Sequence, residues 1–436
     1  MLQGEQITKM RVVKSVGLIL GASIIGMLLL WAVYILPTDS MVENVIKSET
    51  FLKEQDDSEY ILSEEYWKAT DRGTNIIILH EVIYPNTGNA FQDALLAPTA
   101  NYSANWAADW ADVLMKYAKE QCYGEGDYVT YARYWHGYLV LLKPLFMFLQ
   151  LEHIYMLNAI VLTALVACVL LLIKRRLGMY WVAYLFTIAM MHPFNIVQSF
   201  QLSSVFYALN ITLLLLLIKE WKESQIFYIF VMDGILIAFL DFLTYPYVAL
   251  AIPMLTYYLL NKQSSLKDDI IIAVKNALAF VMGYVGMWGM KWVFATAFTY
   301  ENVILNALDS VFHRIGITDA SAKDEVFLSV STVDALKRNI SQLFNEQNMI
   351  ILGIMLVVLG ISMIVYRRTL RVEVNHAIVC AVMAVSPLAW IILLTNHCSL
   401  HPHLEWRTLS ISVFSLAVLT ISSLNMTQQD KRAVHG

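Results

Sequence analysis

Long apolar runs alternate with short polar stretches over most of the chain. The longest runs approach the ~20 residues that a helix needs to cross the hydrocarbon core of a bilayer. Ten of them are expected to be full spans, at residues 16–36, 155–173, 180–197, 202–218, 226–244, 247–260, 270–290, 350–365, 377–395 and 409–424. The pattern predicts an all-α polytopic membrane protein with about ten transmembrane helices.

An eleventh apolar segment, residues 137–151, is short for a span and contains Lys143 and Pro144. Basic clusters decide whether it crosses, because lysine and arginine concentrate in cytoplasmic connections. If it stays on one side, all six clusters are cytoplasmic: Lys9/Arg11/Lys14, Lys174/Arg175/Arg176, Lys219/Lys222, Lys262/Lys267, Arg367/Arg368/Arg371 and Lys431/Arg432. We therefore expect a re-entrant or interfacial helix, which Pro144 favours. Both termini are then cytoplasmic, and the long polar loops are external.

The composition supports this class, with 58% hydrophobic residues, 15% charged residues and a mean hydropathy of +0.57. Residues 37–136 hold 17 acidic and 7 basic side chains, so the rest of the chain is net positive. No basic stripe suggests nucleic-acid binding. Five regions are expected: a cytoplasmic N-terminus with the first span (1–36), an external acidic loop (37–136), a membrane core (137–290), a second external loop (291–349), and C-terminal membrane helices with a short cytoplasmic tail (350–436).

The external loop is expected to contain interfacial helices. Residues 105–118 place Trp106, Trp110, Leu114 and Tyr117 on one helical stripe. Such a helix either lies among lipid headgroups or caps a small soluble domain. The acidic stretch 55–65 is expected to be a solvated face.

The N-terminal apolar run and the cysteines add two further expectations. The run follows basic residues and shows no small-residue cleavage site, which indicates a retained first span and not a removed signal. Cys122 and Cys398 both fall on the external side and could pair, although two free thiols are favoured because no Cys-x-x-Cys spacing occurs.

Cationic side chains gather where apolar segments begin or end on the external side. Arg133 and His136 lie among four aromatic residues just before Lys143, and Lys291 and Arg407 are expected at the same level. Arginine and lysine bind phosphate groups, so this group of cations would suit a lipid phosphate or pyrophosphate. Snorkelling of the cations to headgroups is the alternative.

Two acids belong to one expected span. Asp233 falls near its middle, where an ionisable side chain is costly and functional by default. It would serve as a relay in a proton-coupled transporter, or it is protonated and hydrogen-bonded between helices. Asp241 falls near the external end, where it either acts in function or caps the turn that Pro246 enforces.

Three histidines share one external loop with Cys398: His397, His401 and His403. They could bind zinc, but their spacing is not that of a helical two-histidine site and no acid of the His-Glu-x-x-His kind accompanies them. We favour a histidine that touches substrate. No cofactor is expected, and a divalent metal is the less favoured alternative.

The chain resembles the GT-C superfamily of polytopic glycosyltransferases in three features. These are one first span, a large acidic external loop after it, and an aromatic, polar entry into a short second apolar helix. Residues 131–145, 241–246 and 288–293 are more similar to an uncharacterised group of bacterial integral membrane proteins. That group carries an Asp…Thr-Asp arrangement in its first loop, to which residues 70–75 correspond. Asp71 matches, but Asn75 replaces the second acid and weakens a paired-carboxylate role. In the GT-C superfamily the second helix crosses the bilayer, which conflicts with the charge pattern here.

The resemblance implies a membrane glycosyltransferase that takes a sugar from a polyprenyl-phosphate-linked donor to an envelope glycan or polymer, with membrane lipids around it. Asp71, or less favourably Asp39 or Glu43, would deprotonate the acceptor hydroxyl. The donor phosphate would be held by Arg133, His136, Lys291 and Arg407. The sugar would contact Trp135, Asp241 and His401. The alternatives are a transporter or flippase for a lipid-linked or small polar solute, with Asp233 as the coupling acid, and a non-catalytic envelope scaffold.

Overall fold

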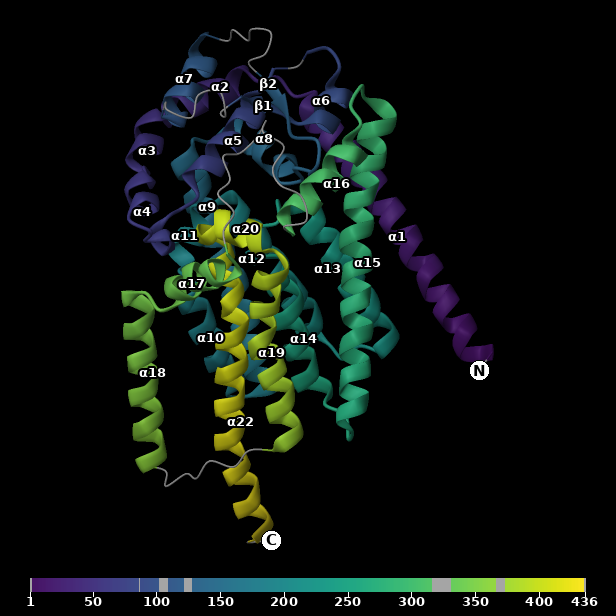
Figure 1. The fold of residues 1–436 in the computed structure, drawn as a ribbon, viewed down its shortest axis with the longest axis vertical. Coiled ribbons are helices and arrows are strands. Elements are labelled where there is room, and N and C mark those ends of the chain that lie inside the picture. Colours follow the sequence, from purple (N-terminus) through teal and green to yellow (C-terminus); the bar gives the residue numbers. More distant parts are fainter. Residues whose placement is uncertain are drawn as a thin grey trace.

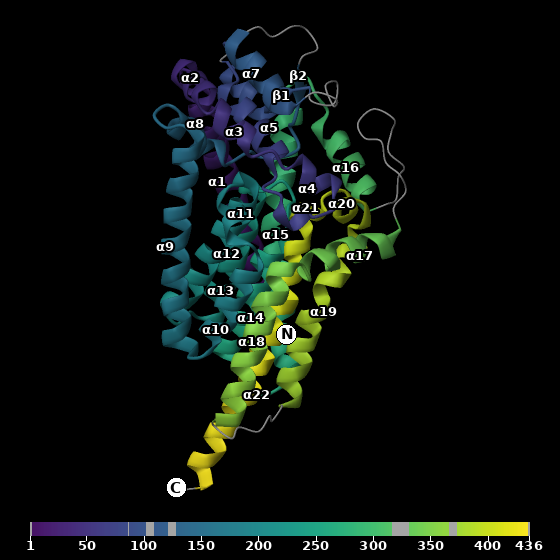
Figure 2. The same cartoon turned by 90° about the vertical axis from the view of Figure 1, so that its left-hand side faces the viewer.

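The computed structural model describes residues 2–85, 87–101, 109–120, 128–315, 331–365 and 373–434. Most of these residues are helical. The two short strands among them, β1 (Pro98–Ala100) and β2 (Tyr128–Thr130), pair antiparallel with Thr99 opposite Val129. Two groups of helices are stacked along the long axis of the molecule, a cap of short helices and a bundle of long ones (Figures 1 and 2).

The cap is built mainly from the chain before residue 139. Its helices are α2 (Asp39–Lys47), α3 (Glu49–Glu54), α4 (Ser58–Leu62), η1 (Tyr66–Lys68), α5 (Arg72–Ile83), α6 (Ala90–Leu96) and α7 (Trp110–Glu120). On α7, Leu114 and Tyr117 are buried against α2, α3 and α5, while Asp112 and Lys116 are exposed. The part of the expected apolar face formed by Leu114 and Tyr117 is thus covered by protein, whereas Trp106 lies outside the described residues.

Seven helices in the described part of the chain are long and apolar enough to cross a bilayer. They are α1 (Leu2–Tyr34), α9 (Leu151–Leu177), α12 (Phe200–Ile218), α13 (Glu223–Leu240), α15 (Leu266–Phe298), α19 (Val374–Leu393) and the segment Pro402–Leu424, which comprises α21 (Pro402–Glu405), η3 (Trp406–Leu409) and most of α22 (Ser410–Val434). An eighth span exists if α17 (Thr332–Leu343) and α18 (Glu346–Val365), bent by 60°, count as one. The helical class, with several helices long and apolar enough to span a membrane, is therefore confirmed, but the count of about ten is not.

Two expected spans are shorter than a bilayer core. The run 180–197 breaks because His192 adopts a left-handed φ of 56° and Pro193 begins a new helix, so α10 (Tyr180–Met190) is followed by α11 (Pro193–Val197). The other short helix, α14 (Tyr247–Asn261), has 15 residues. At 1.5 Å per residue it is about 22 Å long, less than the ~30 Å of a hydrocarbon core.

The apolar segment at 137–151 does not form a spanning helix. It contains α8 (Leu139–Phe146), whose eight residues extend about 12 Å. Both ends of the turn between α8 and α9 are fixed to the cap, because Asn44 Nδ2 donates to Phe146 O at 2.8 Å and Leu151 N donates to Ser48 Oγ at 2.9 Å. The chain therefore enters α9 at the level of the cap.

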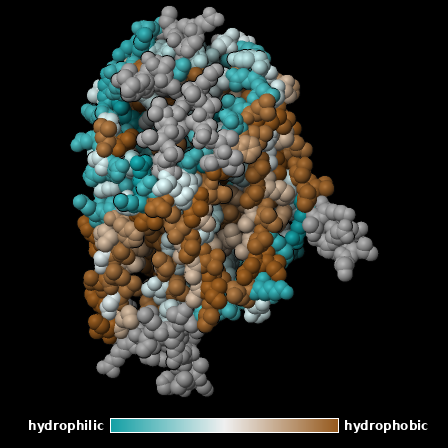
Figure 3. Space-filling model, in the orientation of Figure 1, coloured by the Kyte–Doolittle hydropathy of each residue, from teal (hydrophilic) through white to brown (hydrophobic). Residues whose placement is uncertain are grey.

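The surface of the bundle is mainly hydrophobic, whereas the cap is mainly hydrophilic (Figure 3). Both labelled ends of the chain lie away from the cap (Figure 1). Basic residues occur at this far end of the bundle: Arg11 lies over the ring of Phe227 near the start of α13, and Lys174 lies in the last turn of α9. The molecule thus has a polar, acidic end and a basic end separated by an apolar belt.

Candidate functional site

Asp71 precedes α5 and is buried where the cap meets the bundle. Thr74 Oγ1 donates to Asp71 Oδ1 at 2.7 Å. The other oxygen, Oδ2, is buried and has no hydrogen-bond partner among the described residues. A buried polar atom without a partner is costly, so Asp71 Oδ2 is placed to accept a hydrogen bond or a proton from a guest molecule.

The chain between α19 and α22 brings a row of three histidines to Asp71. His403 Nε2 lies 3.5 Å from Asp71 Oδ1. The ring of His401 follows, with its centroid 5.8 Å from that of His403 and 4.8 Å from that of His397. Burial lowers the pKa of His397 and of His401 well below its ordinary value, so these two rings are neutral near pH 7. We call His397, His401 and His403 the histidine row.

The partners of His397 also fix its tautomer. Its Nε2 lies 2.6 Å from Leu243 O and therefore donates to that carbonyl, while Nδ1 accepts from Arg314 Nη1 at 3.3 Å. One nitrogen donates and the other accepts, as in a neutral imidazole. The far end of the histidine row is thereby held between the turn after α13 and Arg314, the last residue of α16 (Val303–Arg314).

Arg407 is fully buried in η3, beside Asp71 and the histidine row. Its Nη1 donates to His403 O at 2.6 Å and its Nε donates to Met191 O at 3.2 Å. The third donor group, Nη2, has no hydrogen-bond partner within the described chain, and the guanidinium interacts electrostatically with Asp71. A polar guest that offers one donor and one acceptor would satisfy both of these unfilled positions.

Asp241 caps the turn that follows α13. It accepts the backbone N–H groups of Leu243 and Thr244 at 2.9 and 3.0 Å, and the hydroxyl of Thr244 as well. Burial raises the pKa of Asp241 to about 7. The capping role, one of the two that its sequence position left open, is thus present, and Leu243 connects this turn to the histidine row.

A groove of about 150 Å³ opens at the Arg314 end of the histidine row. Its lining includes Arg133, Arg314, Trp288, Trp292 and Trp390. Arg314 Nη2 donates to Tyr134 OH at 2.6 Å, and Arg133 Nη1 donates to Asn306 Oδ1 at 3.0 Å. Arg133 Nε is buried without a partner among the described residues. Two guanidinium groups and three indoles at the border of apolar helices would suit a phosphate that carries an apolar tail.

Two other predicted residues, Trp135 and His136, belong to a neighbouring buried network. Trp135 Nε1 donates to Met287 O at 2.7 Å. His136 Nδ1 lies 2.9 Å from Glu81 Oε1, and its Nε2 lies 2.8 Å from Tyr131 O. None of these contacts reaches Asp71, Arg407 or the histidine row. The geometry gives Trp135 and His136 structural partners and no direct access to the region around Asp71.

Lys291 occupies the same network as a helix cap. Its buried Nζ donates to Ala94 O and Leu95 O, at 3.2 and 2.8 Å, near the C-terminal end of α6. A lysine at a helix C-terminus satisfies carbonyls that have no partner within the helix. Lys291 therefore attaches the cap to α15. It lies near Arg133, since Trp292 Nε1 donates to Arg133 O at 2.9 Å.

Asp39 and Glu43, the less favoured candidate bases, are exposed on α2, and Glu43 pairs with Lys47 at 2.7 Å. The structure therefore separates them from the buried region around Asp71. Cys398 is a buried free thiol, whereas Cys122 lies outside the described residues. No group of three or more His, Cys, Asp or Glu side chains in the described part of the chain is arranged to hold a metal ion.

Sequence reasoning missed Asp57, Glu405 and Arg314. Asp57 is buried and interacts electrostatically with Asp71 and His403; burial and the nearby charge of Asp71 raise the pKa of Asp57. It belongs to an acidic stretch that we expected to be solvated, so local sequence gave no signal. Glu405 lies 3.3 Å from His397 Nε2 and accepts from Trp390 Nε1 at 3.0 Å. The sequence clue to Glu405 was its position two residues after the His-Pro-His sequence.

Three non-glycine residues with left-handed backbone surround this region: Asp71, His192 and Leu243, with φ of 60°, 56° and 73°. Each such conformation costs on the order of 1–3 kcal/mol, and residues of this kind concentrate at functional sites. The ring of His192 lies 5.4 Å from that of Trp406, and Leu243 contacts His397. Three further non-glycine residues, Glu64, Ala97 and His136, have the same left-handed backbone elsewhere in the described chain, so this strain is not confined to the region around Asp71.

The fold and the site define a multi-pass helical membrane protein with a buried acid, an arginine and a row of histidines between a polar cap and the membrane bundle. Comparisons with protein-family models, with curated proteins and with solved structures find no match for this chain.

Proposed function

We propose that the protein is a membrane glycosyltransferase that moves a sugar from a polyprenyl-phosphate-linked donor to an envelope glycan or polymer. The observation that carries the proposal is the buried pair Asp71 and Arg407, each with one unfilled hydrogen-bonding position. A guest that fits must offer both a donor and an acceptor, as a sugar hydroxyl does. The resemblance to the GT-C superfamily, with its acid in the first external loop, agrees with this assignment.

In the proposed reaction, the isoprenoid chain of the donor lies in the groove against the tryptophans. The donor phosphate reaches from the groove to the unfilled Nη2 of Arg407, beside Asp71. Asp71 takes the proton from the acceptor hydroxyl. The acceptor oxygen bonds to the anomeric carbon as the bond from that carbon to the phosphate oxygen breaks, and the guanidinium group of Arg407 stabilises the charge on the departing phosphate.

The proposed orientation places the cap outside the cell and both termini in the cytoplasm. The basic residues at the far end of the bundle, such as Arg11 and Lys174, support it because cytoplasmic connections are rich in lysine and arginine. The sugar would then be transferred on the external face, where an envelope glycan is available.

The test is the sugar content of the cell envelope in a strain that carries Asp71→Asn in place of the wild-type protein. Removal of a general base lowers a rate by roughly 10²–10⁴-fold, so the transferred sugar should disappear. Asp39→Asn is the matched control, because Asp39 is exposed on the same cap, and it should leave the sugar content unchanged. Normal sugar content in the Asp71→Asn strain would remove Asp71 as the base.

A second candidate function, proton-coupled transport, rests on Asp233. This residue is buried within α13, and its carboxylate has no hydrogen bond of ordinary geometry to the described residues, although it interacts with Thr212 of α12. Transport predicts solute uptake that follows the proton gradient and is lost in Asp233→Asn but retained in Asp71→Asn. Sugar transfer predicts the opposite sensitivity, so the two variants separate the two functions.

A further inference from the structure

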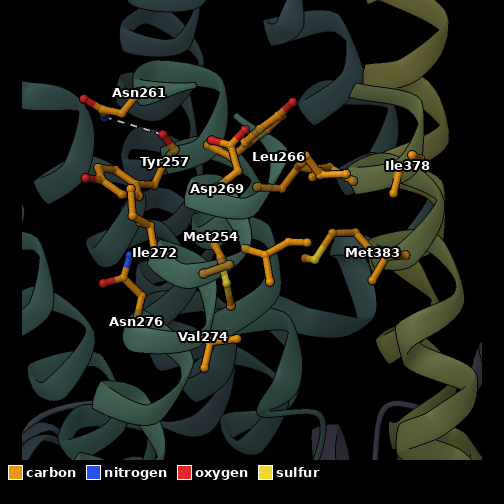
Figure 4. Close-up of a pocket in the computed structure, with 16 residues that line it drawn as sticks. Met254, Tyr257, Asn261, Leu266, Asp269, Ile272, Val274, Asn276, Ile378 and Met383 are labelled. Atoms are coloured by element: carbon orange, nitrogen blue, oxygen red, sulfur yellow. Dashed lines mark hydrogen bonds between the residues drawn. The ribbon is translucent and has the colours of Figure 1, made fainter. Parts of the chain in front are cut away.

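A second cavity, of about 290 Å³, lies between α14, α15 and α19 near the ends of these helices that are far from the cap. Side chains from all three helices line it, among them Met254, Leu266 and Met383 (Figure 4). It is separate from the groove beside the histidine row, because the two share no lining residue. Nothing in the proposed sugar transfer uses this cavity.

The chemistry of the lining selects a hydrocarbon guest. Most of the lining residues are aliphatic, methionine or tyrosine. An apolar cavity of about 150 Å³ stays dry and takes up benzene, and this one is about twice as large. Water would find few partners in its apolar part, so a guest with many methylene groups fits better than solvent.

The exposed residues that line the opening of the cavity show from which side a guest enters. Ile270 and Val274 of α15, and Ile378 and Val382 of α19, line the cavity and are 41 to 63% exposed. All four lie on helices that qualify as membrane spans. A bilayer around the bundle would bring its hydrocarbon directly to this opening, and no aqueous path to it is needed.

The lining also has the polarity of an amphiphile. Asn261 ends α14 and Asp269 lies in the first turn of α15, so both are close to the helix ends. Met254, Val274 and Met383 lie farther from those ends. Figure 4 shows Asn261, Tyr257 and Asp269 towards one end of the cavity, and these three apolar residues, together with the buried Asn276, towards the other. Beyond the polar end, Lys262 pairs with Glu373, and Lys267 is exposed.

We propose that this cavity binds one acyl chain of a membrane phospholipid from the leaflet opposite the cap. The chain end lies against Met254 and Met383, and the headgroup phosphate lies near Lys267 at the start of α15. The site is independent of the proposed sugar transfer, because it lies at the other end of the bundle and takes a different ligand.

The test uses the full chain reconstituted in vesicles of phosphatidylethanolamine and phosphatidylglycerol. A trace of a phospholipid with a diazirine near the end of one acyl chain is added, and crosslinked residues are mapped by mass spectrometry after illumination. Labelling of Leu255, which lines the cavity and is only 1% exposed, is expected, since lipid that merely surrounds the bundle does not reach it. Labelling confined to exposed residues would overturn the proposal.

Variants that fill the cavity provide the second arm. Ala273→Leu and Ala273→Trp add side-chain volume inside the cavity and should lower the labelling of Leu255 stepwise. Leu278→Trp on the exposed face of the same helix is the matched control and should leave it unchanged. The milder leucine variant keeps the test valid if the tryptophan variant fails to fold. Equal labelling in all variants, or labelling of Leu255 by a diazirine-bearing polyprenyl phosphate but not by the phospholipid, would contradict the assignment.

Discussion

At the scale of single residues, Asn75 explains a departure from the resemblance seen in the sequence. The membrane proteins that the chain resembles have an acid at this position, but here the amide uses both of its functions: Nδ2 donates to Gln198 O at 2.8 Å and Oδ1 accepts from Phe200 N at 3.1 Å. A carboxylate could only accept. Asn75 therefore fixes the start of α12 against α5, and Asp57 is the acid that the fold places near Asp71.

The variant Asn75→Asp should accordingly destabilise the protein. It removes the donor to Gln198 O and sets a carboxylate against a carbonyl, at a cost of about 1–3 kcal/mol for an unsatisfied buried group. The midpoint of thermal unfolding in detergent measures this effect. Asn89→Asp is the control, because Asn89 is an exposed cap of α6 where aspartate serves equally well. Equal midpoints for the two variants would contradict the role assigned to Asn75.

His192 should make stability depend on pH. Burial and the neighbouring Arg407 lower the pKa of His192 from 6.5 to about 4. Between pH 4 and pH 6.5 the unfolded chain binds a proton that the folded chain does not bind. The contribution of His192 to the free energy of unfolding is therefore complete above pH 6.5 and is lost as the pH falls towards 4. Unfolding midpoints measured from pH 4.5 to 7.5 should fall on acidification.

His192→Asn should reduce that dependence, since asparagine tolerates left-handed backbone and does not titrate. The remaining slope would come from the other buried histidines. His153→Asn, at an exposed position, serves as the control. A slope as steep in His192→Asn as in the wild type would show that the pKa of His192 has little influence on stability.

At the scale of elements, the sequence predicted the helices well where apolar runs were long. It placed the runs of α9, α12, α13 and α19 because twenty apolar residues leave few alternatives. It failed at 180–197, where the average apolar character concealed the break at His192 and Pro193. The candidate site was harder, because its parts come from α5, the turn after α13, and the segment 395–409. Asp71, Arg407 and His401 were predicted individually, but their proximity depends on tertiary packing.

The crossing of α13 and α15 gives a prediction at the same scale. Gly234 and Gly283 allow the two backbones to approach so closely that a Cβ on Gly283 would overlap Val231 O, while one on Gly234 would overlap Phe280 O. Gly283→Ala should therefore lower stability by about 1–3 kcal/mol or more, as overpacking does. The measurement is thermal unfolding in detergent. Gly289→Ala, in the same helix with open space around its Cβ, should be neutral or stabilising, and an equal loss in both variants would refute the close contact.

At the scale of the whole molecule, the polar cap, the apolar belt and the basic far end predict one orientation in the membrane. Glu43 lies exposed on the cap, and Lys267 lies exposed at the far end. In intact cells an impermeant maleimide should label Glu43→Cys but not Lys267→Cys, and should label both after the cells are broken. Labelling of the wild-type chain is subtracted as background. Labelling of Lys267→Cys alone in intact cells would invert the proposed topology.

The central claim is that the buried region around Asp71 and Arg407 transfers a sugar from a lipid phosphate. In the most direct measurement, purified protein in vesicles is incubated with each of a panel of polyprenyl-phosphate-linked hexoses. Binding of each hexose donor is measured, and so is the release of polyprenyl phosphate in the presence of envelope glycan. The account predicts that wild-type protein releases polyprenyl phosphate from at least one donor. It also predicts that Asp71→Asn binds that donor with unchanged affinity but releases polyprenyl phosphate at a rate lower by roughly 10²-fold or more. Undiminished release by Asp71→Asn, or no binding of any lipid-linked sugar by the wild type, would contradict it.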